Sequence, residues 1–102
     1  MPVKITTDID GDTLRLTLAG EFDMGEVAYF RKAIQEPEEP WQRAVIEMGD
    51  VAFMDSSGLQ ELLHFRERVR EMGRELVLSR PSVAVLRLLE LTGVDSLFTV
   101  RE

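Results

Sequence analysis

Alternating apolar and polar residues mark two strands at the start of the chain. In residues 3–9, Val3 and Ile5 alternate with polar neighbours, and in residues 13–19 leucine occupies every second position from Leu14 to Leu18. A period of two residues is typical of a strand with one buried face. The Asp-Gly-Asp at residues 10–12 favours a tight turn, so we predict that the two strands form a hairpin.

Apolar residues spaced three and four apart predict three helices. The first follows Asp23, a plausible N-cap with Glu26 three residues further on as in a capping box, and runs to about residue 35. The second is expected over residues 58–72 and the third over residues 83–91, where a Thr-Gly pair ends it. The apolar stripe of the second helix comprises Leu59, Leu62, Leu63, Val69 and Met72, with Phe65 on its edge.

The remaining strands are predicted from short apolar runs between the helices. These cover residues 44–48, 76–78 and 97–100; residues 49–50 form a turn or bulge, residues 51–54 lead into the second helix, and residues 20–23 break the second strand. The order is β-β-α-β-α-β-α-β, so we predict an α/β fold with a mixed sheet: an opening hairpin followed by parallel βαβ units. Trp41 is expected to pack over the rim of the core.

Length and charge narrow the classes of function. A chain of 102 residues is expected to form one domain, over residues 1–102. Its net charge of −7 argues against nucleic acid and anionic membranes as partners, since both are bound through Lys and Arg. The absence of cysteine excludes disulfides and thiolate metal sites. Without a signal peptide at residues 1–4 or an apolar run of membrane-spanning length, we expect a cytoplasmic protein.

The densest polar cluster stands between a strand and a helix, at residues 55–58. Asp55, Ser56 and Ser57 can all act as helix caps, and this structural role alone would explain them. Ser57 and Gln60 fit the S-x-x-Q capping box, which favours Ser57 as the N-cap. Ser56 would then lie one residue outside the helix, with its hydroxyl free to accept a phosphate.

Catalytic chemistry finds little support in the sequence. The run at residues 54–58 lacks the first glycine of the G-x-S-x-G elbow, so a serine hydrolase is disfavoured. His64, the sole histidine, is expected to be a partly buried structural residue. We find no phosphate-binding loop and no metal-ligand spacing, and the acidic turn at residues 8–12 lacks the last glutamate of a calcium loop. We therefore expect no enzymatic activity, no cofactor, no metal and no small-molecule substrate.

Several segments together resemble the bacterial anti-sigma factor antagonists, the single-domain STAS proteins. They are the Gly-Glu-Phe-Asp at residues 20–23, the segment 50–59 with its Asp-Ser-Ser-Gly-Leu, the Pro-Ser-Val at residues 81–83, and the Leu-Thr-Gly-Val at residues 91–94 with Phe98. The similarity covers nearly the whole chain. One position departs: Glu47 stands in the central strand where members often have Asp or Asn, which is expected to affect only local pairing.

The resemblance implies a mechanism. The unphosphorylated protein would bind an anti-sigma factor, a serine kinase of the histidine-kinase-like ATPase fold, and so release the sigma factor for transcription. The kinase would phosphorylate the first serine of the motif, Ser56, and a PP2C-type phosphatase would reset it. An alternative is a STAS scaffold subunit of a larger assembly, of the stressosome-like or lipid-transport kind, without a sigma-factor role.

The resemblance also implies a surface for the partner around Ser56. Its expected residues are Asp23, Met24, Asp55, Ser57, Gly58, Leu59 and Gln60. Asp23 and Asp55 would shape the acceptor site, and Met24 and Met54 could offer adaptable apolar contacts, with a purely core role for Met54 as the alternative.

Overall fold

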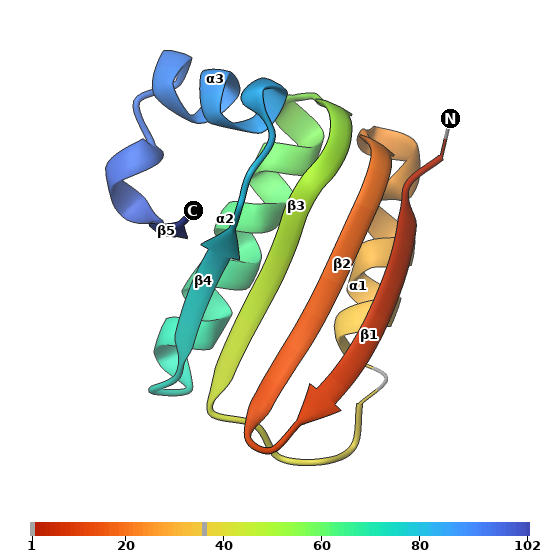
Figure 1. The fold of residues 1–102 in the computed structure, drawn as a ribbon, viewed down its shortest axis with the longest axis vertical. Helices are drawn as coiled ribbons and strands as arrows, with labels where there is room; N and C mark the ends of the chain where they lie inside the picture. The colour runs from red at the N-terminus through yellow and green to blue at the C-terminus, as the bar shows by residue number, and fades with distance from the viewer. Residues whose placement is uncertain (1, 36) are drawn as a thin grey trace.

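A computed structural model describes residues 2–35 and 37–102 (Figure 1). The chain forms β1 (Lys4–Asp10), β2 (Thr13–Phe22), a 3₁₀ turn η1 (Met24–Glu26), α1 (Val27–Gln35) and β3 (Arg43–Met54). It continues with α2 (Ser56–Glu71), β4 (Glu75–Ser79), α3 (Val83–Leu91), η2 (Asp95–Leu97) and β5 (Thr99–Arg101). This order confirms the predicted alternation of strands and helices.

The strands form one sheet in the order β1-β2-β3-β4-β5. β1 and β2 pair antiparallel, as the hairpin prediction required, and the other neighbours pair parallel. Figure 1 shows α1 and α2 on one face of the sheet, while α3 lies near the ends of β3 and β4. Parallel neighbours place the carboxyl ends of β2, β3 and β4 at one edge, where α1, α2 and α3 begin.

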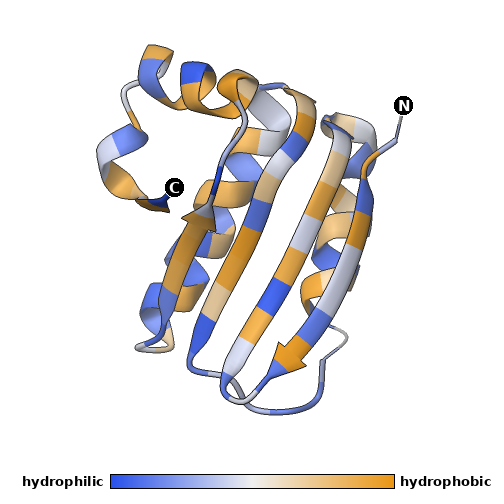
Figure 2. Ribbon diagram, in the orientation of Figure 1, coloured by the Kyte–Doolittle hydropathy of each residue, from blue (hydrophilic) through white to orange (hydrophobic). Residues whose placement is uncertain are grey.

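The core lies between the sheet and the two helices behind it. Alternating residues of the strands fill it, and Figure 2 shows the corresponding alternation of hydrophobic and hydrophilic bands. Leu14, Leu16, Leu18, Ile46 and Leu62 are fully buried. Phe30 of α1 packs edge-on against Phe65 of α2, with ring centroids 5.8 Å apart. Phe65 is therefore buried in the core and not on the edge of the apolar stripe of α2 as predicted, whereas Met72, which was placed in the stripe, is 47% exposed.

Three strands differ in extent from the prediction. β2 does not break at residues 20–23 but continues to Phe22, because β3 runs on beside it. Gly20 makes this possible: its φ is +101°, and a Cβ there would lie only 2.7 Å from the Pro2 carbonyl oxygen. The last strand covers residues 99–101 and not 97–100, because residues 95–97 close a 3₁₀ turn before it. β3 runs without a break over Arg43–Met54 and does not end at residue 48; the predicted turn or bulge appears within it as register shifts between Glu47 and Asp50 and between Val51 and Phe53.

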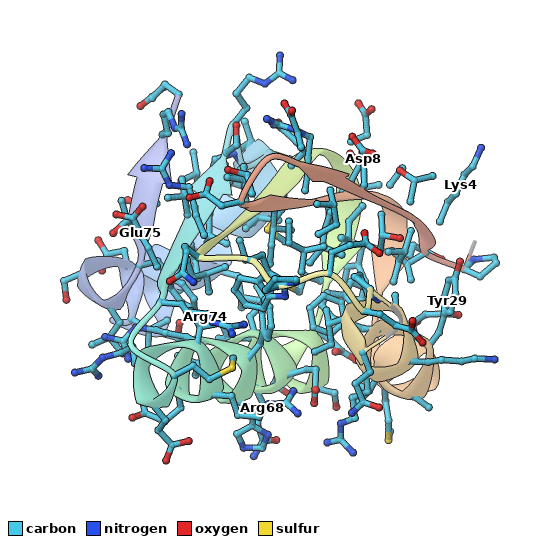
Figure 3. All side chains as sticks on the ribbon, turned by 90° about the horizontal axis from the view of Figure 1, so that it is seen from below. Lys4, Asp8, Tyr29, Arg68, Arg74 and Glu75 are labelled. Atoms are coloured by element: carbon cyan, nitrogen blue, oxygen red, sulfur yellow. The ribbon has the colours of Figure 1, made fainter. Side chains whose placement is uncertain are left out.

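Two side-chain predictions concern the sheet. Trp41 is buried, and the guanidinium carbon of Arg74 lies 4.6 Å from its ring centroid, so Trp41 covers the rim of the core as expected (Figure 3). Glu47 pairs with Arg15 and Arg80, each at 3.2 Å, on the sheet face opposite the helices. The longer glutamate at this position therefore affects local pairing, and it links β2, β3 and the end of β4.

Candidate functional site

The site forms where β2 and β3 end side by side. Phe22 and Met54, the last residues of the two strands, are partners in the parallel register. An aspartate follows each of them, Asp23 after β2 and Asp55 after β3, and each begins a helical segment. The structure thus brings together two acidic turns that lie 32 residues apart in the sequence.

Asp55 is the N-cap of α2. Its backbone is extended, and its Oδ1 accepts a hydrogen bond of 3.0 Å from the Gly58 N–H, while its carbonyl accepts one from the Leu59 N–H. The prediction that Ser57 caps the helix is therefore wrong, and α2 begins at Ser56 and not at residue 58. A carboxylate at this position satisfies an orphan N–H group and also complements the positive end of the helix dipole, which a serine hydroxyl does not.

The two serines consequently occupy the first turn of α2. Ser56 is exposed, and no hydrogen bond of its hydroxyl is found within residues 2–35 and 37–102. Ser57 is half-buried and faces a groove beside α2. The predicted exposure of Ser56 is confirmed, although its physical reason differs: Ser56 is the first helical residue, and its side chain is free because Asp55 does the capping.

Gly58 and Leu59 are buried, so their side-chain positions face inward and not toward solvent. A Cβ at Gly58 would overlap the Phe22 carbonyl oxygen and lie 3.0 Å from the Met54 side chain. The Asp55 N–H donates to that same carbonyl at 3.4 Å. Glycine is thus required where α2 crosses the end of β2, and this close approach fixes the height of Ser56 above the sheet. Met54 is 5% exposed and belongs to the core.

The other members of the candidate site are exposed or half-buried. Asp23 caps η1 by accepting a 3.0 Å hydrogen bond from the Gly25 N–H, and Met24 beside it is 72% exposed. Gln60 is exposed on α2. Phe53, which the sequence analysis did not include, is 48% exposed at the end of β3. The sequence signal for Phe53 was the pair of consecutive apolar residues, Phe53 and Met54, which breaks the alternation before the turn.

A groove of about 670 Å³ runs between α1 and α2 from this turn. It brings Met24, Ser57 and Gln60 of the predicted surface to one place. The groove is lined by Met24, Val27, Ala28, Arg31, Lys32, Gln35, Ser57, Gln60, Glu61 and His64. Apolar residues at its start and cations further along give it a mixed character, which suits a protein segment better than a small apolar ligand.

Glu61 at the floor of the groove is the feature that sequence reasoning missed. Its side chain is 2% exposed, and its two carboxylate oxygens accept hydrogen bonds of 3.0 and 3.1 Å from Arg31 Nε on α1. Arg68 of α2 lies 3.8 Å from the same carboxylate (Figure 3). Glu61 raises the pKa of Arg31 above its ordinary value, first through the hydrogen bond from the guanidinium to the carboxylate and second through the attraction between the two charges.

His64 is the residue of this part of α2 whose predicted environment the structure tests. His64 is exposed two turns along α2, so its prediction as a partly buried structural residue is wrong. It lines the α1–α2 groove, while the adjacent position 65 supplies the core contact. The described residues contain no group of three His, Asp or Glu side chains that could hold a metal ion. Among those residues, no helix has the length and apolar character needed to cross a membrane.

Comparisons with known proteins agree on one family. A family model for the STAS domain matches residues 4–102. A STAS-domain containing protein of Pseudomonas aeruginosa is 26% identical over 100 residues, which cover 98% of this chain and 99% of that protein. The anti-sigma-B factor antagonist of Listeria monocytogenes is 30% identical over 97 residues, which cover 90% of this chain and 82% of that protein.

A solved structure shares the fold. The anti-sigma factor antagonist SpoIIAA of Bacillus in its unphosphorylated form has a TM-score of 0.80 at 20% identity, covering 97% of this chain and 89% of that one. Its phosphorylated form has a TM-score of 0.75 at 19% identity, covering 97% of this chain and 92% of that one. The five-stranded sheet and three helices of this chain are therefore those of a protein solved in both phosphorylation states.

Proposed function

Because this chain belongs to the STAS domain family, we propose that it is an anti-sigma factor antagonist controlled by phosphorylation of Ser56. In this proposal the unphosphorylated form binds an anti-sigma factor serine kinase and so frees the sigma factor. The observation that carries the proposal is the exposed Ser56 hydroxyl in the first turn of α2. Asp55 and Gly58 position this turn, but neither makes a hydrogen bond to the hydroxyl.

The chemistry at Ser56 is that of a substrate. A serine nucleophile needs a base within hydrogen-bond reach, whereas the Ser56 hydroxyl makes no hydrogen bond in the described part of the chain and Asp55 Oδ1 accepts the Gly58 N–H. An exposed hydroxyl at a strand-to-helix turn is, in contrast, accessible to the active site of a kinase. We accordingly propose a regulatory and not an enzymatic role, with ATP supplied through the kinase in the cytoplasm.

A phosphate on Ser56 should change binding more than it changes folding. It adds about −1.5 to −2 charges. The α2 N-terminus favours an anion by about 0.3–1 kcal/mol, while the adjacent Asp55 carboxylate opposes it. These effects are similar in size and opposite in sign, so the fold should tolerate the modification. A partner that buries Ser56 would instead have to remove water from a near-dianion, which costs several kcal/mol.

The docking surface in this proposal consists of the exposed residues around the acceptor. Met24, Phe53 and Gln60 are accessible, and the α1–α2 groove begins beside Ser57. Gly58 and Leu59 contribute by positioning the turn, since both are buried. In this proposal Asp23 and Asp55 shape the acceptor site through the two turns that they cap. The partners are a kinase of the histidine-kinase-like ATPase fold and a PP2C-type phosphatase.

Phosphate mapping tests the proposal. The chain is incubated with its cognate anti-sigma kinase and ATP, and intact mass and peptide mapping locate the product. We expect one phosphate on Ser56, none in a Ser56→Ala variant, and unchanged labelling in a Ser57→Ala variant. Labelling of Ser57 would overturn the assignment of the acceptor, and the absence of any phosphate would favour the scaffold role.

A further inference from the structure

The outer face of α3 is apolar and uncovered. Only Val85 and Leu89 of this helix are buried, while Val83 is 70% and Leu91 78% exposed. A surface helix normally presents polar residues to solvent, so large exposed apolar residues at both ends of one helix indicate a binding surface. Neither residue has a part in the site around Ser56.

The exposed residues of α3 form one continuous stripe. A shallow groove of about 400 Å³ runs along it, lined by Val83, Leu86, Arg87, Glu90 and Leu91. Their spacings of three and four residues place them on one side of the helix. The stripe thus has apolar positions at its two ends and one charge of each sign between them.

The two charges of the stripe have no partners among the described residues. Arg87 and Glu90 make no side-chain hydrogen bond or ion pair with any part of the chain that the structure describes, although most arginines of the sheet and of α2 do. In an antiparallel pair of such stripes, the cation of each copy faces the anion of the other. This self-complementarity is what an interface with two-fold symmetry requires.

We propose that the α3 stripe binds a second copy of this chain, as an antiparallel pair of α3 helices. With the two-fold axis midway between positions 87 and 90, Arg87 of each copy faces the partner's Glu90. The same register brings Leu86 of each copy opposite the partner's Leu91, so both charged and apolar contacts form twice.

The α3 stripe shares no residue with the α1–α2 groove. In Figure 1, α3 lies on the β4 side of the sheet, and α1, which forms one wall of the α1–α2 groove, lies on the β1 side. A pair of nine-residue helices buries less area than a standard interface of about 1,200–2,000 Å². We therefore expect a weak dimer with a dissociation constant of about 10–100 µM, and its existence does not depend on phosphorylation of Ser56.

Sedimentation equilibrium over a range of concentrations tests the pair. Arg87→Glu and Glu90→Arg should each weaken association about tenfold, because each places like charges across the two-fold axis. The double variant R87E/E90R restores opposite charges and should recover the wild-type dissociation constant within about threefold. Leu91→Ser should also weaken association, and since Leu91 is exposed, the fold should survive the change.

Matched controls separate this effect from general surface changes. Met72→Ser alters another exposed apolar residue, after α2, and Lys4→Glu reverses a charge on β1; neither should change the dissociation constant. A chain that remains monomeric at about 1 mM overturns the proposal and leaves α3 to a different protein. A dimer that is insensitive to the charge reversals, or not restored by the double variant, overturns it as well.

Discussion

The carbonyl oxygen of Phe22 accepts a hydrogen bond of 3.4 Å from the Asp55 N–H, although Phe22 ends β2 and Asp55 directly follows β3. The same carbonyl faces Gly58, one helical turn further along the chain. One backbone oxygen of β2 therefore sets both the start of α2 and its distance from the sheet. The position of Ser56 follows from these two contacts, since it lies between Asp55 and Gly58.

Gly58→Ala should destabilise the fold by about 1–3 kcal/mol, because the added Cβ overlaps the Phe22 carbonyl and forces α2 away from β2. Urea unfolding measures the change as a lower midpoint. Gly25→Ala is the matched control, since its Cβ would meet only the Asp23 side chain at 3.4 Å, an ordinary contact. Equal midpoints for the two variants would show that α2 can move without cost.

Asp55→Ala should cost about 1 kcal/mol through loss of the N-cap, whereas Asp55→Asn should retain most of the stability because an amide oxygen also accepts the Gly58 N–H. Ser57→Ala should change stability by less than about 0.5 kcal/mol, as for a surface residue with no capping role. The same unfolding experiment compares all three variants. A larger loss for Ser57→Ala than for Asp55→Ala would contradict the capping seen here.

The comparison of sequence with structure shows which features local patterns can reveal. The order of elements was predictable because alternation and helical spacing are local properties, and the exposure of Ser56 followed from the polar turn. The choice of N-cap was not predictable, because Asp55 and Ser57 are both good caps. The start of α2 is set by the hydrogen bond between the Asp55 N–H and the carbonyl of Phe22, which lies 33 residues upstream of Asp55 in the sequence. The continuation of β2 past Gly20 likewise depends on β3 beside it.

The ion pair of Glu61 could not be predicted from the sequence either, because it also depends on a contact between elements that are distant in the sequence. On α2 alone, Glu61 is one more acid of a charged helix, and its burial depends on α1 packing against that side. His64 was expected to be partly buried because it stands beside the apolar stripe, but the adjacent Phe65 takes the core position. The helical spacing of apolar residues does not fix the boundary between buried and exposed positions to within one residue when the extent of the neighbouring element is unknown.

Arg31→Ala should lower stability more than Glu61→Gln does. The first change leaves a buried carboxylate with only the more distant Arg68 at 3.8 Å, while the second leaves a neutral amide and a cation that solvent can reach. In the Glu61→Gln background, Arg31→Ala should therefore have a much smaller effect, which a double-mutant cycle in urea measures.

Lys32→Ala is the control for the ion pair between Arg31 and Glu61. It removes a neighbouring exposed cation of α1 that has no ion pair among the residues that the structure describes. Its effect should be small in both backgrounds. Additive effects of Arg31→Ala and Glu61→Gln would show that the two side chains do not stabilise each other.

Ser56→Asp should weaken binding to the cognate anti-sigma kinase at least tenfold, a change of about 1.4 kcal/mol. The reason is that a partner covering Met24, Phe53 and the first turn of α2 must strip water from the new charge. Ser56→Ala should bind like the wild type, and isothermal titration calorimetry compares the three proteins. Ser57→Asp is the control for negative charge at this end of the helix. The Ser57 side chain is half-buried at the groove, and if charge alone matters, Ser57→Asp should weaken binding as Ser56→Asp does. Equal affinities for the wild type, Ser56→Ala and Ser56→Asp would exclude a switch at this residue.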